Sequence, residues 1–158
     1  MEDLHSAYLT LLDELSGDME SLAALAREKT AAVRRDDLGA LNDVMKREQA
    51  LALSLRGREQ KRQKLAAQLE LEGTHLSALP HSVPKPLLPR AQETVERLRR
   101  SYDSYRNAAE VARHTLEINL HEIEKIIAAH GIDPAQSVGY AAEAMAEPPK
   151  NLKTDFRA

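Results

Sequence analysis

The chain of 158 residues contains no cysteine and no tryptophan, and it has only one phenylalanine and four tyrosines. The lack of cysteine excludes disulfide frameworks, thiolate metal sites and cysteine nucleophiles. With so few aromatic side chains, the core must be built from Leu, Ala, Ile, Val and Met, a mixture that favours helices over strands. Charged residues make up 30% of the chain. Together with abundant Ala, Glu and Leu, this is typical of long helices or coiled coils.

Long apolar runs are also missing from the sequence. No stretch approaches the ~18 uninterrupted apolar residues that a membrane span requires. The first residues carry Glu2 and Asp3 and lack the basic start and apolar run of a signal peptide. We therefore expect a cytoplasmic protein with no membrane insertion.

The chain also has no excess of positive charge, since 22 Lys and Arg are outnumbered by 25 Asp and Glu and the net charge is −3. Such a chain has no general attraction for phosphate backbones. One local basic run lies at residues 56–64, but it contains no aromatic side chain that could stack on a base. We predict a solvated helix face at this run and no nucleic-acid partner.

Apolar residues that recur at alternating steps of three and four predict three long helices. The first is expected at about residues 3–33 and the second at about residues 38–71. Between them, Asp36 or Asp37 can cap the second helix by accepting its free N–H groups. Gly73 is expected to end the second helix.

Charged residues interrupt the apolar seams of these two helices. Lys29 interrupts the seam of the first helix, and Glu48, Glu59 and Arg62 occupy seam positions of the second. The seam of the second helix must therefore be widened by neighbouring leucines or carry a paired charge.

The third helix has the most regular pattern, with a seam of five heptads between residues 89 and 130 in which Asn119 is the one polar seam residue. Four prolines in residues 74–89 predict a connector before it, with at most one short turn at residues 75–79. Gly131 is suited to end the helix. At 1.5 Å per residue the helix is ~60 Å long, which favours an elongated antiparallel bundle or hairpin.

The predicted fold is therefore all-α. An elongated antiparallel bundle or hairpin of three long helices with coiled-coil-like seams is expected at residues 1–131. Residues 132–158 mix small residues with scattered single apolar ones and are expected to form a flexible C-terminal tail. This tail could also dock on the bundle or on a partner. The oligomeric state is not set by the sequence.

The residues show no pattern of an enzyme. The six glycines are scattered singly, so there is no phosphate-binding loop and no G-x-S-x-G elbow. One helical face of the third helix carries four potential metal ligands, but the first helix has no matching Glu-x-x-His; the four are Glu110, His114, Glu117 and His121. We expect no catalytic residue, no cofactor and no metal, with a metal-dependent bundle enzyme as a remaining alternative.

Asn119 is the one polar residue in the seam of the third helix. A buried asparagine in a coiled-coil seam fixes the register of the helices at some loss of stability. We interpret Asn119 chiefly as such a register device, and secondarily as a contact for a partner.

A set of residues along the first two helices follows the order of one known family: Glu28, Asp37, Leu41, Lys46, Leu51, Leu55, Glu59 and Arg62. With Asn107 and Asn119 in the third helix and Tyr140 in the tail, the chain resembles the FlgN-type flagellar export chaperones over about residues 5–145. The resemblance implies a cytoplasmic chaperone that holds hook-filament junction (hook-associated) proteins before export through the flagellar type III apparatus. The alternative is a generic coiled-coil adaptor or scaffold with unrelated partners.

The third helix carries more apolar surface than its two neighbours need. Besides the seam, Leu120 and Ile127 form a second stripe, with Val111 and Ile118 on another flank. Contiguous surplus apolar surface marks a partner site. We therefore expect the C-terminal half of this helix to form a partner-binding groove that two tail residues cover. The predicted partner-binding residues are Leu116, Asn119, Leu120, Ile123, Ile127, Tyr140 and Met145.

Overall fold

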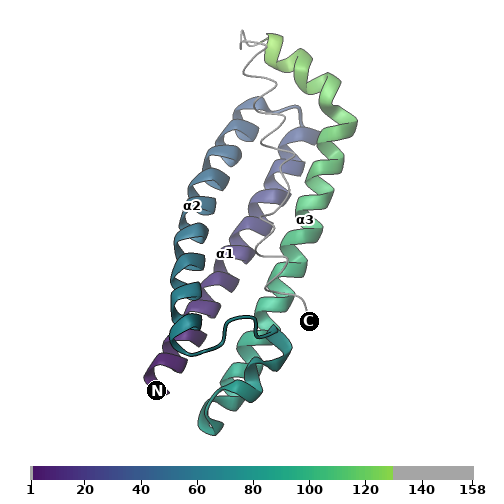
Figure 1. The fold of residues 1–158 in the computed structure, drawn as a ribbon. Helices are drawn as coiled ribbons and strands as arrows, with labels where there is room; N and C mark the ends of the chain where they lie inside the picture. The colour runs from purple at the N-terminus through teal and green to yellow at the C-terminus, as the bar shows by residue number, and fades with distance from the viewer. Residues whose placement is uncertain (1, 130–158) are drawn as a thin grey trace. The chain divides into compact units, whose positions relative to one another are not determined.

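The computed structural model describes residues 2–129, which form three long α-helices and no strand. Helix α1 spans Glu2–Arg34, α2 spans Leu38–Gln68 and α3 spans Leu88–Ala129 (Figure 1). Two 3-10 helices, η1 at Leu76–Ser82 and η2 at Lys85–Leu87, lie in the connector between α2 and α3. The predicted fold class of three long helices is confirmed. The predicted tail at residues 132–158 lies outside the described residues.

The turn between α1 and α2 follows from local hydrogen bonding. Asp36 adopts a left-handed conformation, with φ of 53°, and the N–H of Asp37 donates to the carbonyl of Ala32 at 2.9 Å. This six-to-one bond is the Schellman pattern that closes a helix. Oδ1 of Asp37 then accepts a hydrogen bond from the N–H of Ala40 at 3.0 Å. Asp37 is therefore the residue that caps α2, one of the two expected from the sequence.

Helix α2 ends earlier than the sequence pattern predicted. Glu70 is left-handed, with φ of 56°, and the N–H of Leu71 donates to the carbonyl of Ala66 at 2.8 Å. The predicted end at Gly73 is wrong because this turn closes the helix first and buries Leu69 and Leu71. Gly73, with φ of 74°, lies in the next turn instead.

The connector is more structured than the one short turn expected from its prolines. Leu76, Leu79 and Pro80 of η1 are buried. The prolines end the α-helical pattern as predicted, but the apolar residues between them fold into two short 3-10 helices that proline tolerates.

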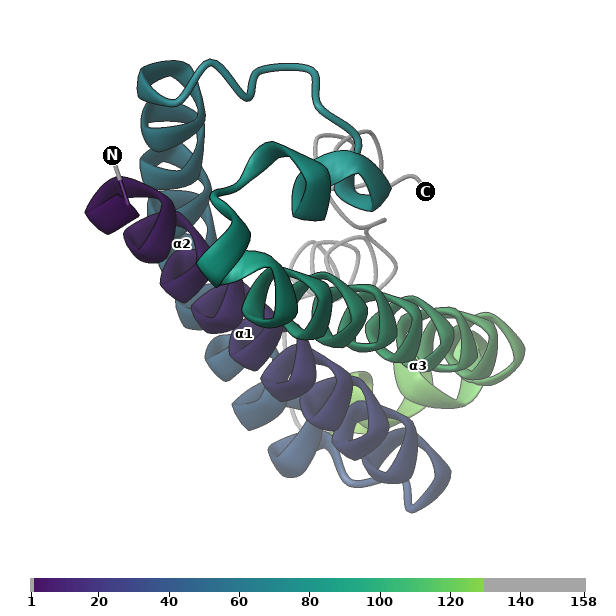
Figure 2. The same cartoon turned by 90° about the horizontal axis from the view of Figure 1, so that it is seen from below.

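The described residues divide into two compact units, and each contains part of all three long helices. The first unit holds α1 as far as Glu20 together with residues 52–104. The second holds residues 21–51 and the described part of α3 from Tyr105 onward. Within each unit, α2 runs antiparallel to α1 and α3 (Figures 1 and 2).

Each unit has its own apolar core. The first is centred on long side chains that are almost completely buried, namely Leu9, Leu12, Leu15, Met19 and Leu98. The second is a smaller cluster of Ala32, Val33, Leu41, Met45 and Leu116. Leu, Ala, Val and Met thus make up most of both cores, and Tyr8 and Tyr102 are the aromatic residues buried in the first unit among the described residues.

Candidate functional site

The C-terminal half of α3 is the surface for which the sequence predicts partner binding. Ile123 and Ile127 belong to α3, but their side chains lie outside the described part of the structure. Tyr140 and Met145 also lie outside the described residues. The structure therefore places the side chains of three of the predicted residues, Leu116, Asn119 and Leu120.

Leu116 lies in the core of the second unit. It is only 2% exposed and packs in the cluster that contains Val33, Leu41 and Met45. Next to it on α3, Asn119 and Leu120 are half-buried. These three residues thus run from the core of the unit to its edge, and only Asn119 and Leu120 offer surface in this conformation.

The amide of Asn119 is bonded to its own helix. Its Nδ2 donates to the carbonyl oxygen of Thr115 at 2.8 Å. Thr115 makes the same kind of contact one turn earlier, since its hydroxyl donates to the carbonyl of Val111 at 2.8 Å. The polar interruption of the seam is therefore satisfied within α3.

The apolar surface that α3 exposes is formed by Val111 and Ile118. These side chains are 50% and 68% exposed, respectively. Residues seven apart lie two turns apart on one face of a helix, and the exposed His114 lies between them. We call Val111 and Ile118 the α3 stripe. Sequence reasoning named both residues as a flank of the helix. Each comes one residue before a seam position, Ala112 and Asn119 respectively, and so points away from the buried seam.

The charges beside the α3 stripe are paired with one another. Arg113 lies 3.2 Å from Glu110 and 3.4 Å from Glu117. Glu110 and Glu117 are the two carboxylates considered above as metal ligands, and both form ion pairs with the guanidinium of Arg113. Among the side chains that the structure describes, which do not include His121, no group of three His, Asp or Glu residues is arranged to hold a metal ion.

A second polar constellation lies in the first unit, around Arg62 of α2. Its Nη2 and Nε donate to the two carboxylate oxygens of Glu59 at 2.6 and 2.9 Å, and its Nη1 donates to the hydroxyl of Tyr8 at 3.2 Å. Burial opposes the charge of Arg62, but its hydrogen bonds and the charge of Glu59 outweigh burial and raise the pKa of the guanidinium. The charges in the α2 seam are thus paired, as one of the two predicted solutions required.

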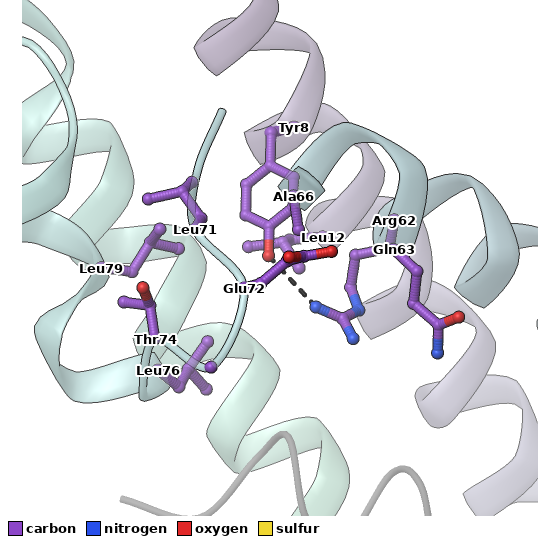
Figure 3. Close-up of a pocket in the computed structure, with 11 residues that line it drawn as sticks. Tyr8, Leu12, Arg62, Gln63, Ala66, Leu71, Glu72, Thr74, Leu76 and Leu79 are labelled. Atoms are coloured by element: carbon purple, nitrogen blue, oxygen red, sulfur yellow. Dashed lines mark hydrogen bonds between the residues drawn. The ribbon is translucent and has the colours of Figure 1, made fainter. Parts of the chain in front are cut away.

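Beside this network lies a cavity of about 280 Å³. Figure 3 shows Tyr8 of α1 and Arg62 of α2 on one side of it, with leucines of the connector opposite; the apolar lining residues are Leu12, Ala66, Leu71, Leu76 and Leu79. Glu59 already neutralises Arg62, and Glu72 adds a further negative charge to the lining. The network therefore serves as a buried link between α1 and α2, and it is poorly suited to hold an anion.

Comparison with known protein families identifies a match over most of the chain. The sequence model of a protein family described as FlgN protein matches residues 1–148 of the chain. No curated protein and no solved structure matches it. Within the described part of the chain, none of the helices combines the length and apolar character needed to cross a membrane.

Proposed function

The chain belongs to the FlgN family of flagellar export chaperones, and we propose that it holds hook-filament junction proteins in the cytoplasm before their export through the flagellar type III apparatus. The family is one of chaperones rather than enzymes. The client in this proposal is a terminal helix of a junction protein, which lacks its assembly partner before export and therefore exposes an apolar stripe.

The observation that carries this proposal is the exposure of the α3 stripe. Val111 and Ile118 present two large apolar side chains on one helical face. An amphipathic helix binds such a face by packing its own apolar residues, spaced at three, four and seven, against it. Half-buried Leu120 offers further apolar surface on the opposite flank of the α3 seam.

The remaining predicted residues complete the proposed groove. Ile123 and Ile127 continue α3 beyond Leu120, and in the proposal they extend the apolar contact with the client. Tyr140 and Met145 form a removable cover that occupies the groove when no client is bound. Exchange between cover and client is then a competition for one surface, which requires no ATP.

The proposal is tested by removing the α3 stripe. The double variant Val111→Ser, Ile118→Ser is titrated calorimetrically with a synthetic junction-protein terminal helix, and its affinity is compared with that of the wild type. Loss of two apolar contacts is expected to weaken binding by more than tenfold. Wild-type binding should show a negative heat-capacity change, because it buries apolar surface.

Leu4→Ser provides the matched control. Leu4 is 37% exposed but belongs to α1 in the other unit, so its replacement should leave client affinity unchanged. A second double variant, Leu120→Ser with Ile127→Ser, tests the second apolar stripe predicted on α3. If both double variants bind the client as tightly as the wild type, the groove lies elsewhere. If the wild type binds no junction-protein helix at all, the generic adaptor function replaces the chaperone function.

A further inference from the structure

The outward face of α2 in the first unit combines an exposed leucine with uncompensated positive charge. Leu53 is 67% exposed, and Arg56, Gly57, Lys61 and Lys64 are all exposed. Leu53, Gly57 and Lys64 follow a spacing of four and seven residues, which places them along one side of the helix. Arg56 and Lys61 flank that line. We call these five residues the basic face.

The positive charges of the basic face have no acidic partner within the described chain. Elsewhere on the same stretch of α2, arginines are matched by carboxylates: Arg58 lies 3.6 Å from Glu14 and also pairs with Asp18. In contrast, no described carboxylate lies within ion-pair distance of Arg56, Lys61 or Lys64. The excess is local, because the chain as a whole carries a net charge of −3.

Gly57 leaves the backbone open in the middle of the basic face. A Cβ atom added there would meet no atom within 4 Å, so packing inside the chain does not require a glycine. Glycine in a helix interior lowers helix stability. Its physical advantage at an exposed position is that another chain can approach the backbone closely.

We propose that the basic face binds an acidic helix of a partner protein. Carboxylates of that helix pair with Arg56, Lys61 and Lys64, an apolar side chain covers Leu53, and the helix crosses close to the backbone at Gly57. A nucleic acid would use the cations but supply no apolar cover for Leu53, and the face has no aromatic side chain for stacking. Three cations and one leucine on an acidic chain are also a poor anchor for a lipid surface.

This inference does not rest on the proposed function, because the basic face and the α3 stripe lie on different helices and in different units. Its test uses the full chain and a synthetic amphipathic helix with a leucine seam flanked by glutamates. A counterpart peptide carries lysines in place of the glutamates. Binding is measured by fluorescence anisotropy at low and at physiological salt. The acidic peptide is expected to bind, more weakly as salt rises, and the basic peptide is not.

Charge variants locate the binding surface. The triple variant Arg56→Gln, Lys61→Gln, Lys64→Gln is expected to bind the acidic peptide about tenfold more weakly or worse. The matched control is Arg34→Gln, Lys85→Gln, Arg106→Gln, which removes the same charge from other exposed positions and should bind like the wild type. Equal losses in both triple variants would overturn the proposal, as would failure of the wild type to bind the acidic peptide.

A steric variant separates docking from long-range attraction. Gly57→Leu keeps every charge and favours helix, so its circular dichroism should match the wild type while its affinity falls about tenfold. Unchanged affinity of this variant would overturn docking across Gly57. Single-stranded DNA and phosphatidylserine vesicles serve as the remaining probes. If either binds through the basic face more tightly than the acidic helix, the partner is not an acidic protein and the proposal is wrong.

Discussion

Nζ of Lys29 on α1 lies 2.8 Å from Oε2 of Glu48 on α2. Each residue interrupts the apolar seam of its own helix, and the two interruptions meet inside the second unit. The Lys29 side chain is 6% exposed and the Glu48 side chain 23%. A charge that looks unfavourable in either helix alone is therefore matched by its neighbour in the fold.

Replacement of one partner of this pair should destabilise the second unit. Lys29→Met leaves the carboxylate of Glu48 without its ammonium partner, and we expect the free energy of unfolding to fall by about 1–3 kcal/mol. The double variant Lys29→Met, Glu48→Leu should recover most of this loss, because an apolar pair needs no partner. Urea unfolding of both variants and of Glu48→Leu completes a double-mutant cycle.

An exposed ion pair provides the control for that cycle. Arg47 and Glu28 lie 2.7 Å apart with side chains 53% and 48% exposed. Arg47→Met is expected to change the free energy of unfolding by less than ~1 kcal/mol. A loss at Lys29 no larger than at Arg47, or a double variant as unstable as Lys29→Met, would show that burial of the pair contributes little.

Local patterns predicted the helices well because their causes are local. The heptad seams place the three helices, and Asp37 caps α2 as its position suggested. The meeting of Lys29 and Glu48 was not predicted, since a heptad pattern does not say which residue of one helix faces which residue of another. The end of α2 was missed for a related reason. Burial of Leu69 and Leu71 closes the helix before the glycine that marked its expected end.

The partner-binding site on α3 stays a prediction, but the exposure of its apolar residues can be compared with the sequence pattern. Surplus apolar surface on α3 was expected, and Val111 and Ile118 are exposed there. Leu116 was expected to contact a partner, yet it lies in the core cluster with Met45. Sequence periodicity identifies the apolar positions of a helix, but neighbouring helices determine which of those positions are covered.

Glu20 should contribute to the loss of folding stability at low pH. Arg97 lies 3.1 Å from its carboxylate. Hydrogen bonding by Arg97 is the main cause that lowers the pKa of Glu20 from its usual 4.5; slight burial opposes it and Ser101 adds to it. A lowered folded-state pKa means that the stabilisation is present above the unfolded pKa. It is lost as the pH falls through the folded pKa.

Glu20→Gln should therefore flatten the dependence of stability on pH. Urea unfolding at about pH 6 and about pH 3 is expected to show a smaller loss for the variant than for the wild type. The difference should stay below ~1 kcal/mol, because the pair is largely exposed to solvent. Parallel pH profiles for the two proteins would show that Glu20 does not contribute to the acid response.

Glu70→Gly is expected to stabilise the protein. Glu70 adopts a left-handed conformation with φ of 56°, which strains a residue with a Cβ atom by about 1 kcal/mol and costs glycine nothing. Thermal unfolding should show a gain of about 0.5–1 kcal/mol, part of the relief being offset by the greater freedom of glycine in the unfolded chain. Gly73→Ala makes the opposite change, because it places a Cβ atom on a residue with φ of 74°, and it should lower stability. The added Cβ would meet no atom within 4 Å, so any loss reports the backbone conformation alone. A destabilised Glu70→Gly would mean that the glutamate side chain holds this turn.

Asn119→Leu should raise stability while loosening the control of assembly. Among the described residues, the Asn119 amide donates to the carbonyl of Thr115 at 2.8 Å. That carbonyl keeps its helical partner, the backbone N–H of residue 119, after the substitution. No buried group is left unpaired, and a half-buried leucine adds apolar contact, so we expect a gain of about 0.5–1.5 kcal/mol in the free energy of unfolding. A seam without its polar residue also discriminates less between registers, so light scattering coupled to gel filtration should show a broader range of oligomers.

Asn119→Ala, which removes the amide without adding apolar surface, should leave stability closer to the wild type. A less stable Asn119→Leu with unchanged assembly would show that the amide stabilises the fold through a contact beyond Thr115, and the register function would then be wrong.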